Sequence, residues 1–323
     1  MKAIVQDTYG ATDVLQLRDI DKPEIADDEV LVRIHAAGVD RGVWHLMTGL
    51  AYPIRLAGYG LRAPKTPVPG MDLAGVVEAV GKDVTRFQPG DEVFGIGKGA
   101  YAEYARAPEK KLAPKPANLT FEQAAAVAIS GLTALQGVRD HGRVEPGQKV
   151  LIIGASGGVG TFAVQLAKAF GAEVTAVCST TKVDLVRSLG ADHVIDYTRD
   201  DFAKGQQRYN VILDIGGNAS LSRLRRALAP KGTLVIVGGE TGGRWLGGYD
   251  RQLRARLLSR FVGQNLRSFI NSENYQDMIV LTELIEAGKV TPVIDRTYPL
   301  TEVPKAIRYL EEGHARGKLV ITV

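Results

Sequence analysis

Cysteine is nearly absent from the chain, which has one, Cys178, among 323 residues. A single thiol cannot form an internal disulfide or a cysteine-rich structural zinc site. Long apolar runs are missing too: no window approaches the roughly 18 consecutive apolar residues that a membrane helix needs. The first residues, MKAIVQDTYG, contain no apolar signal region. These absences predict a soluble, cytoplasmic protein without membrane insertion.

Strong charge of one sign is also lacking. Lys and Arg number 40 and Asp and Glu 36, so the formal net charge is only +4, and no basic run exceeds two residues. This pattern is not typical of a nucleic-acid interface, and no nucleic-acid partner is expected. Glycine, in contrast, is abundant at 37 residues, and it marks places where the backbone turns or approaches another group closely.

The first 120 residues read as short strands separated by turns. Strands are predicted over Lys2–Val5, Glu29–His35 and Leu73–Val80, and the Pro-rich segment Ala51–Pro69 reads as a surface loop. Without a sustained helical period, this region predicts a small β-rich domain.

From Lys149 onward, apolar strands alternate with helices. Helices are predicted over Val159–Phe170, Lys182–Leu189 and Ala219–Leu228, and strands over Tyr209–Asp214 and Thr233–Val237, among others. The strands are almost continuously apolar, as expected when helices cover both faces of a parallel sheet. The last residues return to short strands around one helix, Val303–Gly313. The predicted fold is α/β: a doubly wound parallel Rossmann sheet inserted in a β-rich domain.

A glycine loop opens this alternation. KVLIIGASGGVG, residues 149–160, places an A-x-G-x-x-G pattern between an apolar strand and a helix, which is the context of a dinucleotide-binding loop. Gly157 would let the backbone approach the pyrophosphate, and Gly160 would let helix and strand pack closely. A tight turn without a ligand is the alternative. The candidate cofactor-binding residues are Ala155, Ser156, Gly157, Gly158, Val159 and Gly160.

The end of the next strand indicates which dinucleotide binds. An NAD site usually has an acid there for the ribose 2′-OH, but this strand leads into Ser179, Thr180 and Lys182, and Glu173 lies at its other end. Two hydroxyls and a cation suit a 2′-phosphate, so NADP(H) is the predicted cofactor. Ser179 and Thr180 can also cap the following helix, and the two roles are compatible.

Several segments, in this order, are similar to one family. They are PGMDLAGVVEAVG (69–81), FQPGDEVFG (87–95), LGADHVIDY (189–197), GTLVIVGG (232–239) and ARGKLVI (315–321). Together with the glycine loop they resemble the medium-chain dehydrogenase/reductase superfamily, and within it the zinc-free, zeta-crystallin-like quinone oxidoreductase branch. The resemblance implies a GroES-like catalytic domain, residues 1–122 and 271–323, around a Rossmann NADPH-binding domain, residues 123–270.

The resemblance adds further candidates for cofactor contacts. It places Tyr197 near the 2′-phosphate and Lys318 near the cofactor cleft, although packing on the adenine side and a solvated surface lysine are the respective alternatives. Gly238 and Gly239, with Phe269 and Ile270, are expected where the carboxyl edge of the sheet meets the nicotinamide. The arginine-rich segment Arg244–Arg267 reads as a basic amphipathic helix, either for a membrane or acidic partner or, as the family favours, near a homodimer contact.

The zinc ligands of related alcohol dehydrogenases are missing. Where those enzymes carry a cysteine, this chain has Val39-Asp40-Arg41, and where they carry a His-Glu pair it has Met71-Asp72. No metal is therefore expected. Without a Lewis acid, hydride addition to a conjugated acceptor is easier than reduction of an isolated ketone, because charge spreads onto a carbonyl oxygen.

Four residues are the candidate catalytic groups. The Asn-Pro-x-Asp motif of quinone-reductase relatives is broken here, and Asp40, Arg41, His45 and Tyr52 stand in its neighbourhood. Asp40 and His45 can share a helical turn as a proton relay, and Tyr52 can donate to a carbonyl oxygen. The alternative is that this cluster only orients a loop.

The predicted function is a zinc-independent transfer of hydride from NADPH to a quinone or an α,β-unsaturated carbonyl. One alternative is a metal-free carbonyl or alcohol oxidoreductase. Another is an NADPH-binding regulatory or nucleic-acid-interacting protein with little catalysis.

Overall fold

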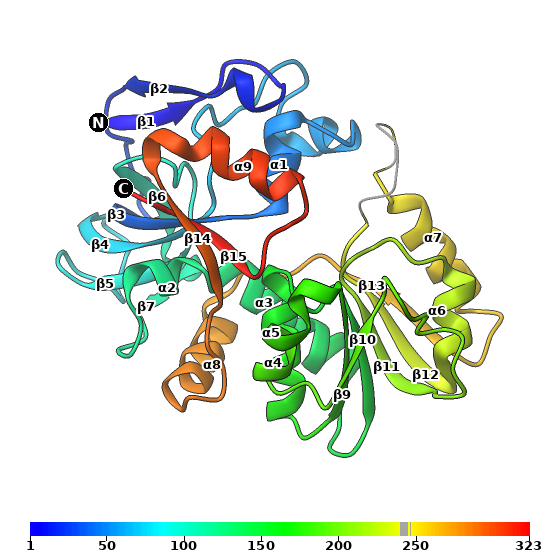
Figure 1. The fold of residues 1–323 in the computed structure, drawn as a ribbon. Helices are drawn as coiled ribbons and strands as arrows, with labels where there is room; N and C mark the ends of the chain where they lie inside the picture. Colours follow the sequence, from blue (N-terminus) through cyan, green and yellow to red (C-terminus); the bar gives the residue numbers. More distant parts are fainter. Residues whose placement is uncertain (240–244, 246) are drawn as a thin grey trace. The chain divides into compact units, whose positions relative to one another are not determined.

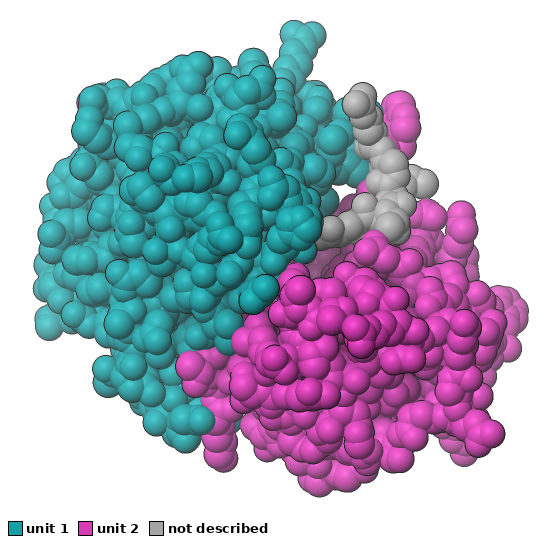
Figure 2. All heavy atoms as spheres, viewed as in Figure 1, with its two compact units in different colours: residues 1–132, 273–288, 292–323 teal, residues 133–272, 289–291 magenta. Residues whose placement is uncertain are grey.

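The computed structural model describes residues 1–239, 245 and 247–323, and these form two compact units, coloured separately in Figure 2. Unit 1 contains residues 1–132, 273–288 and 292–323, and unit 2 contains residues 133–272 and 289–291. The domain limits expected from the sequence, with residues 1–122 and 271–323 in one domain and residues 123–270 in the other, remain a prediction.

Unit 1 is built on a seven-stranded sheet with the order β14-β15-β3-β4-β5-β7, and β6 pairs with β3 (Figure 1). Its strands are β3 (Glu29–Val39), β4 (Asp72–Val80), β5 (Glu92–Ile96), β6 (Tyr104–Pro108), β7 (Leu112–Pro114), β14 (Ile294–Pro299) and β15 (Lys318–Thr322). β1 (Lys2–Val5) and β2 (Gln16–Asp19) form a separate antiparallel pair. β15 runs antiparallel to β3, so the end of the chain completes a sheet begun by its first hundred residues.

Helices cover this sheet and close its core. They are α1 (Arg41–Thr48), α2 (Phe121–Ala125), the first part of α3 (Ala128–Gln136), α8 (Tyr275–Glu286) and α9 (Val303–Glu311). α9 buries Val303, Ala306 and Ile307 in the same apolar core as Val30 and Val32 of β3. The predicted loop 51–69 contains one π-helical turn, Arg55–Tyr59.

Unit 2 contains a six-stranded, all-parallel sheet with the order β10-β9-β8-β11-β12-β13. Its strands are β8 (Lys149–Ile153), β9 (Glu173–Cys178), β10 (His193–Asp196), β11 (Tyr209–Asp214), β12 (Leu228–Ile236) and β13 (Asn265–Ser268). Val150, Leu151 and Ile152 of β8 are fully buried, because both faces of the sheet are covered. The predicted doubly wound Rossmann sheet within an α/β fold is confirmed.

The covering helices are α4 (Gly158–Ala169), α5 (Val183–Ser188), α6 (Leu221–Ala227) and α7 (Tyr249–Leu258). Figure 1 shows α4 and α5 on one face of the sheet and α6 and α7 on the other. The expectation of one helix over Arg244–Arg267 was wrong, because α7 ends at Leu258 and the segment finishes as strand β13. Arg244 and Leu246 lie outside the described residues. Among the helices that are described, none is long and apolar enough to span a membrane.

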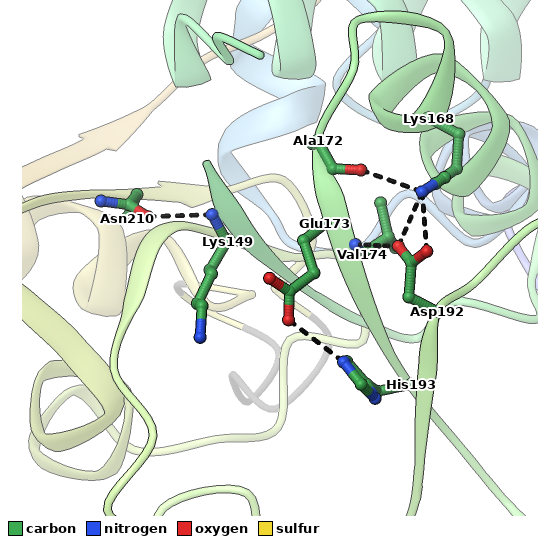
Figure 3. Close-up of polar contacts among 8 residues, drawn as sticks. All are labelled: Lys149, Lys168, Ala172, Glu173, Val174, Asp192, His193 and Asn210. Carbon is green, nitrogen blue, oxygen red and sulfur yellow. Dashed lines mark hydrogen bonds and ion pairs between the residues drawn. The ribbon is translucent and has the colours of Figure 1, made fainter. Parts of the chain in front are cut away.

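Side chains hold together the amino ends of β9 and of the outermost strand, β10 (Figure 3). Lys168 Nζ, from α4, lies 2.8 and 2.7 Å from the two carboxylate oxygens of Asp192, and Asp192 also accepts the Val174 N–H at 2.7 Å. Glu173 and His193 are joined at 3.1 Å. These contacts occupy one edge of the sheet, and the glycine loop lies at the opposite, carboxyl edge.

Candidate active site

The glycine loop has the geometry of an anion site. β8 ends at Ile153, Gly154 turns the chain with φ of +84°, and α4 begins at Gly158 with Gly157 as its N-cap. Gly157 offers no side chain to the helix end, and the first turn of α4 contains no acidic residue. The first N–H groups of a helix have no acceptor within it, so they and the helix dipole suit a phosphate.

The loop requires glycine at one position for its own packing. A Cβ atom at Gly160 would lie 2.1 Å from the carbonyl oxygen of Gly154, so any side chain there would force the backbone to shift. At Gly157 the nearest atom to such a Cβ is 3.6 Å away, so the space beside it is open. Ala155 and Ser156, which belong to the loop, are buried. Gly160 thus closes the loop, while Gly157 leaves room for a group from outside.

Glycines of two neighbouring strand ends border the loop. A Cβ at Gly154 would lie 2.8 Å from Gly216 N, and one at Gly217, where φ is +70°, would lie 3.0 Å from the Gly238 carbonyl carbon. Gly239 is less constrained, since its nearest such contact is 3.6 Å. The carboxyl ends of β8, β11 and β12 therefore approach each other closely. Gly216 and Gly217 were not among the predicted site residues, although the pair follows an apolar strand in LDIGG.

The end of β9 differs from expectation in one respect. Thr180 Oγ1 donates a hydrogen bond of 2.6 Å to the carboxylate of Asp196, the last residue of the neighbouring strand β10. That hydrogen bond, with those from Thr198, holds the pKa of Asp196 below its usual value, although burial acts to raise it. Ser179 is the N-cap of a short 3-10 turn, Thr180–Lys182, without a side-chain capping bond. An acid therefore stands near the predicted 2′-phosphate position, contributed by another strand.

Two other predicted cofactor contacts of unit 2 are largely exposed, and a third packs on a ring. Tyr197 follows β10 and is 62% exposed, and Ile270 is 83% exposed. The Phe269 ring stacks on His141, with 4.2 Å between the centroids.

A buried ion pair lies beside the glycine turn that follows β11. Asp214, fully buried at the end of β11, accepts a hydrogen bond from Arg251 of α7. Arg251 also donates to the carbonyl oxygens of Gly217 and Ala219, at 2.5 and 3.1 Å. Burial raises the pKa of Asp214, and Arg251 opposes that rise. Arg251 thus ties α7 to the turn next to the phosphate loop, a role that the sequence did not suggest.

Unit 1 contains a buried cluster of three charged residues. Lys318 Nζ lies 2.5 Å from Asp40 Oδ1 and 2.9 Å from Asp72 Oδ2, and Asp72 Oδ1 accepts the Ile129 N–H at 2.8 Å. Lys318, Asp40 and Asp72 are 2%, 8% and 0% exposed. Asp40 was a predicted catalytic group and Lys318 a predicted cofactor contact. We name this cluster the Asp40–Lys318–Asp72 triad.

The electrostatics of the triad follow from its burial. Burial and, next, repulsion by the Asp40 carboxylate raise the pKa of Asp72 well above its usual value, and Lys318 only partly opposes them. Burial acts to lower the pKa of Lys318, but the two carboxylates outweigh it and raise that pKa. Lys318 is therefore a fixed cation at every physiological pH.

Helix α1 carries the next candidate, His45. His45 Nδ1 lies 3.0 Å from the carbonyl oxygen of Leu50. Because a carbonyl only accepts hydrogen bonds, Nδ1 carries the proton, and Nε2 is the acceptor nitrogen of the neutral ring. Trp44 stacks edge-on against His45, and its indole N–H donates to Glu311. Asp40 thus contacts Lys318 in the triad, and His45 Nδ1 donates to the backbone of Leu50.

Arg41 is the first residue of α1, and Tyr52 follows the helix, four residues after its last residue, Thr48. The Arg41 guanidinium is 6.0 Å from the Trp44 ring, and that of Arg55 is 5.0 Å from the Tyr52 ring. Arg55 Nε also donates to the Gly49 carbonyl oxygen, at 2.9 Å, just beyond the end of α1. A cation at a helix C-terminus is stabilising, and sequence reasoning missed Arg55.

Comparisons with known proteins agree with this geometry. The alcohol dehydrogenase GroES-like domain family matches residues 26–117, and the zinc-binding dehydrogenase family matches residues 189–321. The chain is 36% identical to mouse NAD(P)H oxidoreductase RTN4IP1, over 100% of this chain and 89% of the relative. It is 35% identical to tomato 2-methylene-furan-3-one reductase, over 99% of this chain and 79% of that protein. The chain is a medium-chain dehydrogenase/reductase.

Solved structures of this superfamily share the whole fold. The quinone oxidoreductase of Coxiella burnetii has a TM-score of 0.88 at 29% identity, covering 100% of this chain and 99% of that one. The Escherichia coli quinone oxidoreductase, solved as a complex with NADPH, has a TM-score of 0.85 at 26% identity, covering 100% of both chains. This medium-chain dehydrogenase/reductase is thus similar to quinone and enone reductases along its full length.

Zinc, which one matching family is named for, does not fit the residues present. Among residues 1–239, 245 and 247–323, no group of three or more His, Cys, Asp or Glu side chains is arranged to hold a metal. The two carboxylates at the expected ligand positions, Asp40 and Asp72, are bound to Lys318. The thiol of Cys178 lies in β9 of unit 2, where burial and Asp196 raise its pKa to about 11. One thiol cannot by itself supply the set of ligands that a zinc site needs.

Proposed function

We propose that this chain is an NADPH-dependent oxidoreductase that transfers hydride to a quinone or an α,β-unsaturated carbonyl. One observation carries the proposal: an open phosphate loop lies in a chain whose full-length relatives are named for this chemistry. Among them are an NADPH-dependent alkenal/one oxidoreductase, 35% identical over 99% of this chain, and a human quinone oxidoreductase, 32% identical over 99%.

The residues of unit 2 bind and orient the cofactor in this proposal. The N–H groups at the start of α4 hold the pyrophosphate, and the open space at Gly157 admits it. Arg251 holds the Gly216–Gly217 turn beside the loop. NADPH, when bound, supplies the hydride, and the protein supplies position and electrostatics.

Preference for NADPH over NADH depends on two opposing charges. Lys182 favours the 2′-phosphate, whereas the nearby Asp196 carboxylate opposes it. Lys182→Ala should narrow the difference between the NADPH and NADH dissociation constants, and Asp196→Asn should widen it. Equal binding of both cofactors by the wild-type chain would contradict this assignment.

The residues around α1 handle the acceptor in this proposal. His45 accepts or returns a proton at Nε2, because Nδ1 donates to Leu50, and it is a proton donor only when both nitrogens are protonated. Arg41 and Tyr52 orient the carbonyl oxygen. Asp40 acts through its contact with Lys318 instead of through a relay with His45.

Turnover with defined acceptors tests the function. We expect NADPH oxidation with quinones or enones and very slow oxidation with saturated ketones. With NADPH deuterated at the transferred position, an enone should gain deuterium at its β-carbon. Oxidation with saturated ketones alone would favour a carbonyl reductase, and NADPH binding without oxidation across the panel would favour a regulatory protein.

Catalysis without zinc is part of the proposal. Its support is the donor set, in which the carboxylates at positions 40 and 72 face an ammonium. Purified active enzyme should contain far less than one zinc per chain by elemental analysis and should keep its activity in a chelator. Stoichiometric zinc lost together with activity would refute it.

A homodimer is proposed through unit 2. Four exposed apolar side chains recur at every fourth residue along and just beyond α7: Tyr249, Leu253, Leu257 and Phe261. Leu257→Glu should shift a dimer toward monomer in sedimentation, while Leu17→Glu, at an exposed site in unit 1, should not. A monomeric wild type would contradict this.

We also propose a cytoplasmic location. The relative RTN4IP1 is named a mitochondrial protein, so imaging of the tagged chain in cells is the test.

A further inference from the structure

We propose that the ammonium of Lys318 is a built-in cation that takes the place of a metal ion in unit 1, and that Lys318 is a positioning residue for helix α1. The inference rests on the proposed zinc-independent function. Its main tests, however, measure metal binding and stability, so they can fail separately from it.

The triad joins three distant parts of the chain. Asp40 stands between β3 and α1, Asp72 begins β4 and Lys318 begins β15, so the contacts span 278 and 246 residues of sequence. A metal ion commonly links remote segments in this way through carboxylate ligands. Here the cation is covalently part of β15 and cannot dissociate.

The surroundings of the ammonium suit nitrogen rather than a metal. The distances from Nζ to its two carboxylate oxygens, 2.5 and 2.9 Å, are those of charge-assisted hydrogen bonds, whereas zinc–oxygen bonds are about 2.0–2.2 Å. A metal could reach these oxygens only in the volume that Nζ occupies. The side chain of Lys318 therefore excludes a metal and supplies its charge.

Glycine beside the triad is needed for this contact. A Cβ at Gly38 would lie 2.8 Å from Asp72 Oδ2, the oxygen that accepts from Lys318, and 2.5 Å from the Ala125 carbonyl oxygen. A side chain there would push Asp72 away from the ammonium. The sequence around β3 is thus adapted to the buried cation.

Both carboxylates also lie at helix N-termini. Asp40 precedes Arg41, the first residue of α1, yet its side chain makes no capping bond and points to Lys318 instead. Asp72 accepts the N–H of Ile129 in the first turn of α3. One ammonium therefore fixes the start of two helices, and α1 carries Trp44 and His45.

Removing the ammonium should create a metal site. In Lys318→Ala the two carboxylates face an emptied volume, and Mn²⁺ prefers such oxygen ligands. We expect Lys318→Ala to bind one Mn²⁺ per chain by electron paramagnetic resonance. Its melting temperature should rise by roughly 5 °C when Mn²⁺ is about 100-fold above its dissociation constant. Wild type should show neither effect.

Two control variants make this result specific. Lys318→Ala/Asp72→Asn should lose the Mn²⁺ response, and Lys305→Ala, which breaks an exposed pair with Glu302, should resemble wild type. Lys318→Ala that folds but ignores Mn²⁺ would overturn the proposal. So would Mn²⁺ binding by wild type that Asp72→Asn abolishes.

The positioning role has its own readout, which also applies if Lys318→Ala fails to fold. Lys318→Met/Asp40→Asn/Asp72→Asn carries no buried charge, and Lys318→Arg keeps the cation. We expect kcat of the uncharged variant to be at least tenfold below that of wild type, with an unchanged KM for NADPH. The kcat of Lys318→Arg should stay much closer to that of wild type, because the cation is kept. An uncharged variant with wild-type kcat, or equal losses in both variants, would refute the positioning role.

Discussion

The two units manage charge in opposite ways. In unit 2, the N-cap of α4 is Gly157, which has no side chain, so the N–H groups at the start of α4 receive no hydrogen bond from a capping residue. In unit 1, Lys318 is paired with Asp40 and Asp72 away from water. A site that binds an exchangeable anion needs hydrogen-bond donors that no protein group already occupies. A cluster that holds helices in place needs donors and acceptors that are bound to each other. NADPH should therefore stabilise unit 2, and the triad should stabilise unit 1 with no ligand present.

The largest loss of stability is expected at the Arg251–Asp214 pair, because there unit 2, like unit 1, contains a buried pair of charged side chains. Arg251→Met leaves Asp214 fully buried without its cation, so the free energy of unfolding should fall by about 3–5 kcal/mol in urea titrations. Arg254→Met, on the same helix, breaks an exposed pair with Asp250 and should cost about 0–1 kcal/mol. Equal losses would show that the Asp214 pair is no more important than a surface pair.

The next effect separates the two glycines of the loop. Gly160→Ala forces a backbone shift against the Gly154 carbonyl and should lower the free energy of unfolding by about 1–3 kcal/mol. Gly157→Ala has room in the fold, so its stability should change little. Its NADPH dissociation constant, measured by titration calorimetry, should nevertheless rise at least tenfold. A Gly157→Ala chain that binds NADPH like wild type would remove Gly157 from the cofactor site.

A smaller difference is expected within the triad. Asp72 accepts from Lys318 and from the Ile129 N–H, whereas Asp40 accepts from Lys318 and its Oδ2 is buried with no hydrogen-bond partner among the described residues. Asp72→Asn should therefore cost about 1 kcal/mol more than Asp40→Asn in thermal unfolding without cofactor. The reverse order would mean that the helix contact of Asp72 contributes little.

The smallest effect concerns pH and the opposite edge of the sheet. Burial raises the pKa of Asp192, but hydrogen bonds from Lys168 and Val174 outweigh it and hold the pKa below its usual 3.8. A carboxyl with a lowered folded pKa stabilises the fold above its unfolded pKa, and this stabilisation is lost as the pH falls through the folded pKa. Wild type should therefore lose stability below about pH 5 more steeply than Asp192→Asn, in melts at a series of pH values. Parallel curves would contradict the pKa assignment.

Features formed by residues that follow one another in the sequence were predictable, whereas contacts between distant residues were not. The Rossmann sheet and its loop lie in order along residues 149–170, so apolar period and glycine spacing were enough to predict them. The triad was not predictable, because its contacts join residues more than 240 positions apart and pairing depends on how β15 meets β3. Asp196 was missed for a related reason: it ends β10, and only strand order brings it to Thr180. The carboxyl ends of parallel neighbours share an edge, so that acid could have been found.

Because Lys318 is buried, the rate at which its amine is chemically labelled reports how often unit 1 opens. At 2% exposure, with both neighbours hydrogen-bonded to it, its amine is unreactive toward acylating reagents while the fold is closed. Labelling of Lys318 must wait for an opening that separates β15 from β3 and β4. Exposed lysines such as Lys82 and Lys305, by contrast, react at once. Mass spectrometry of one peptide over time would thus report how often the C-terminal strand leaves its sheet.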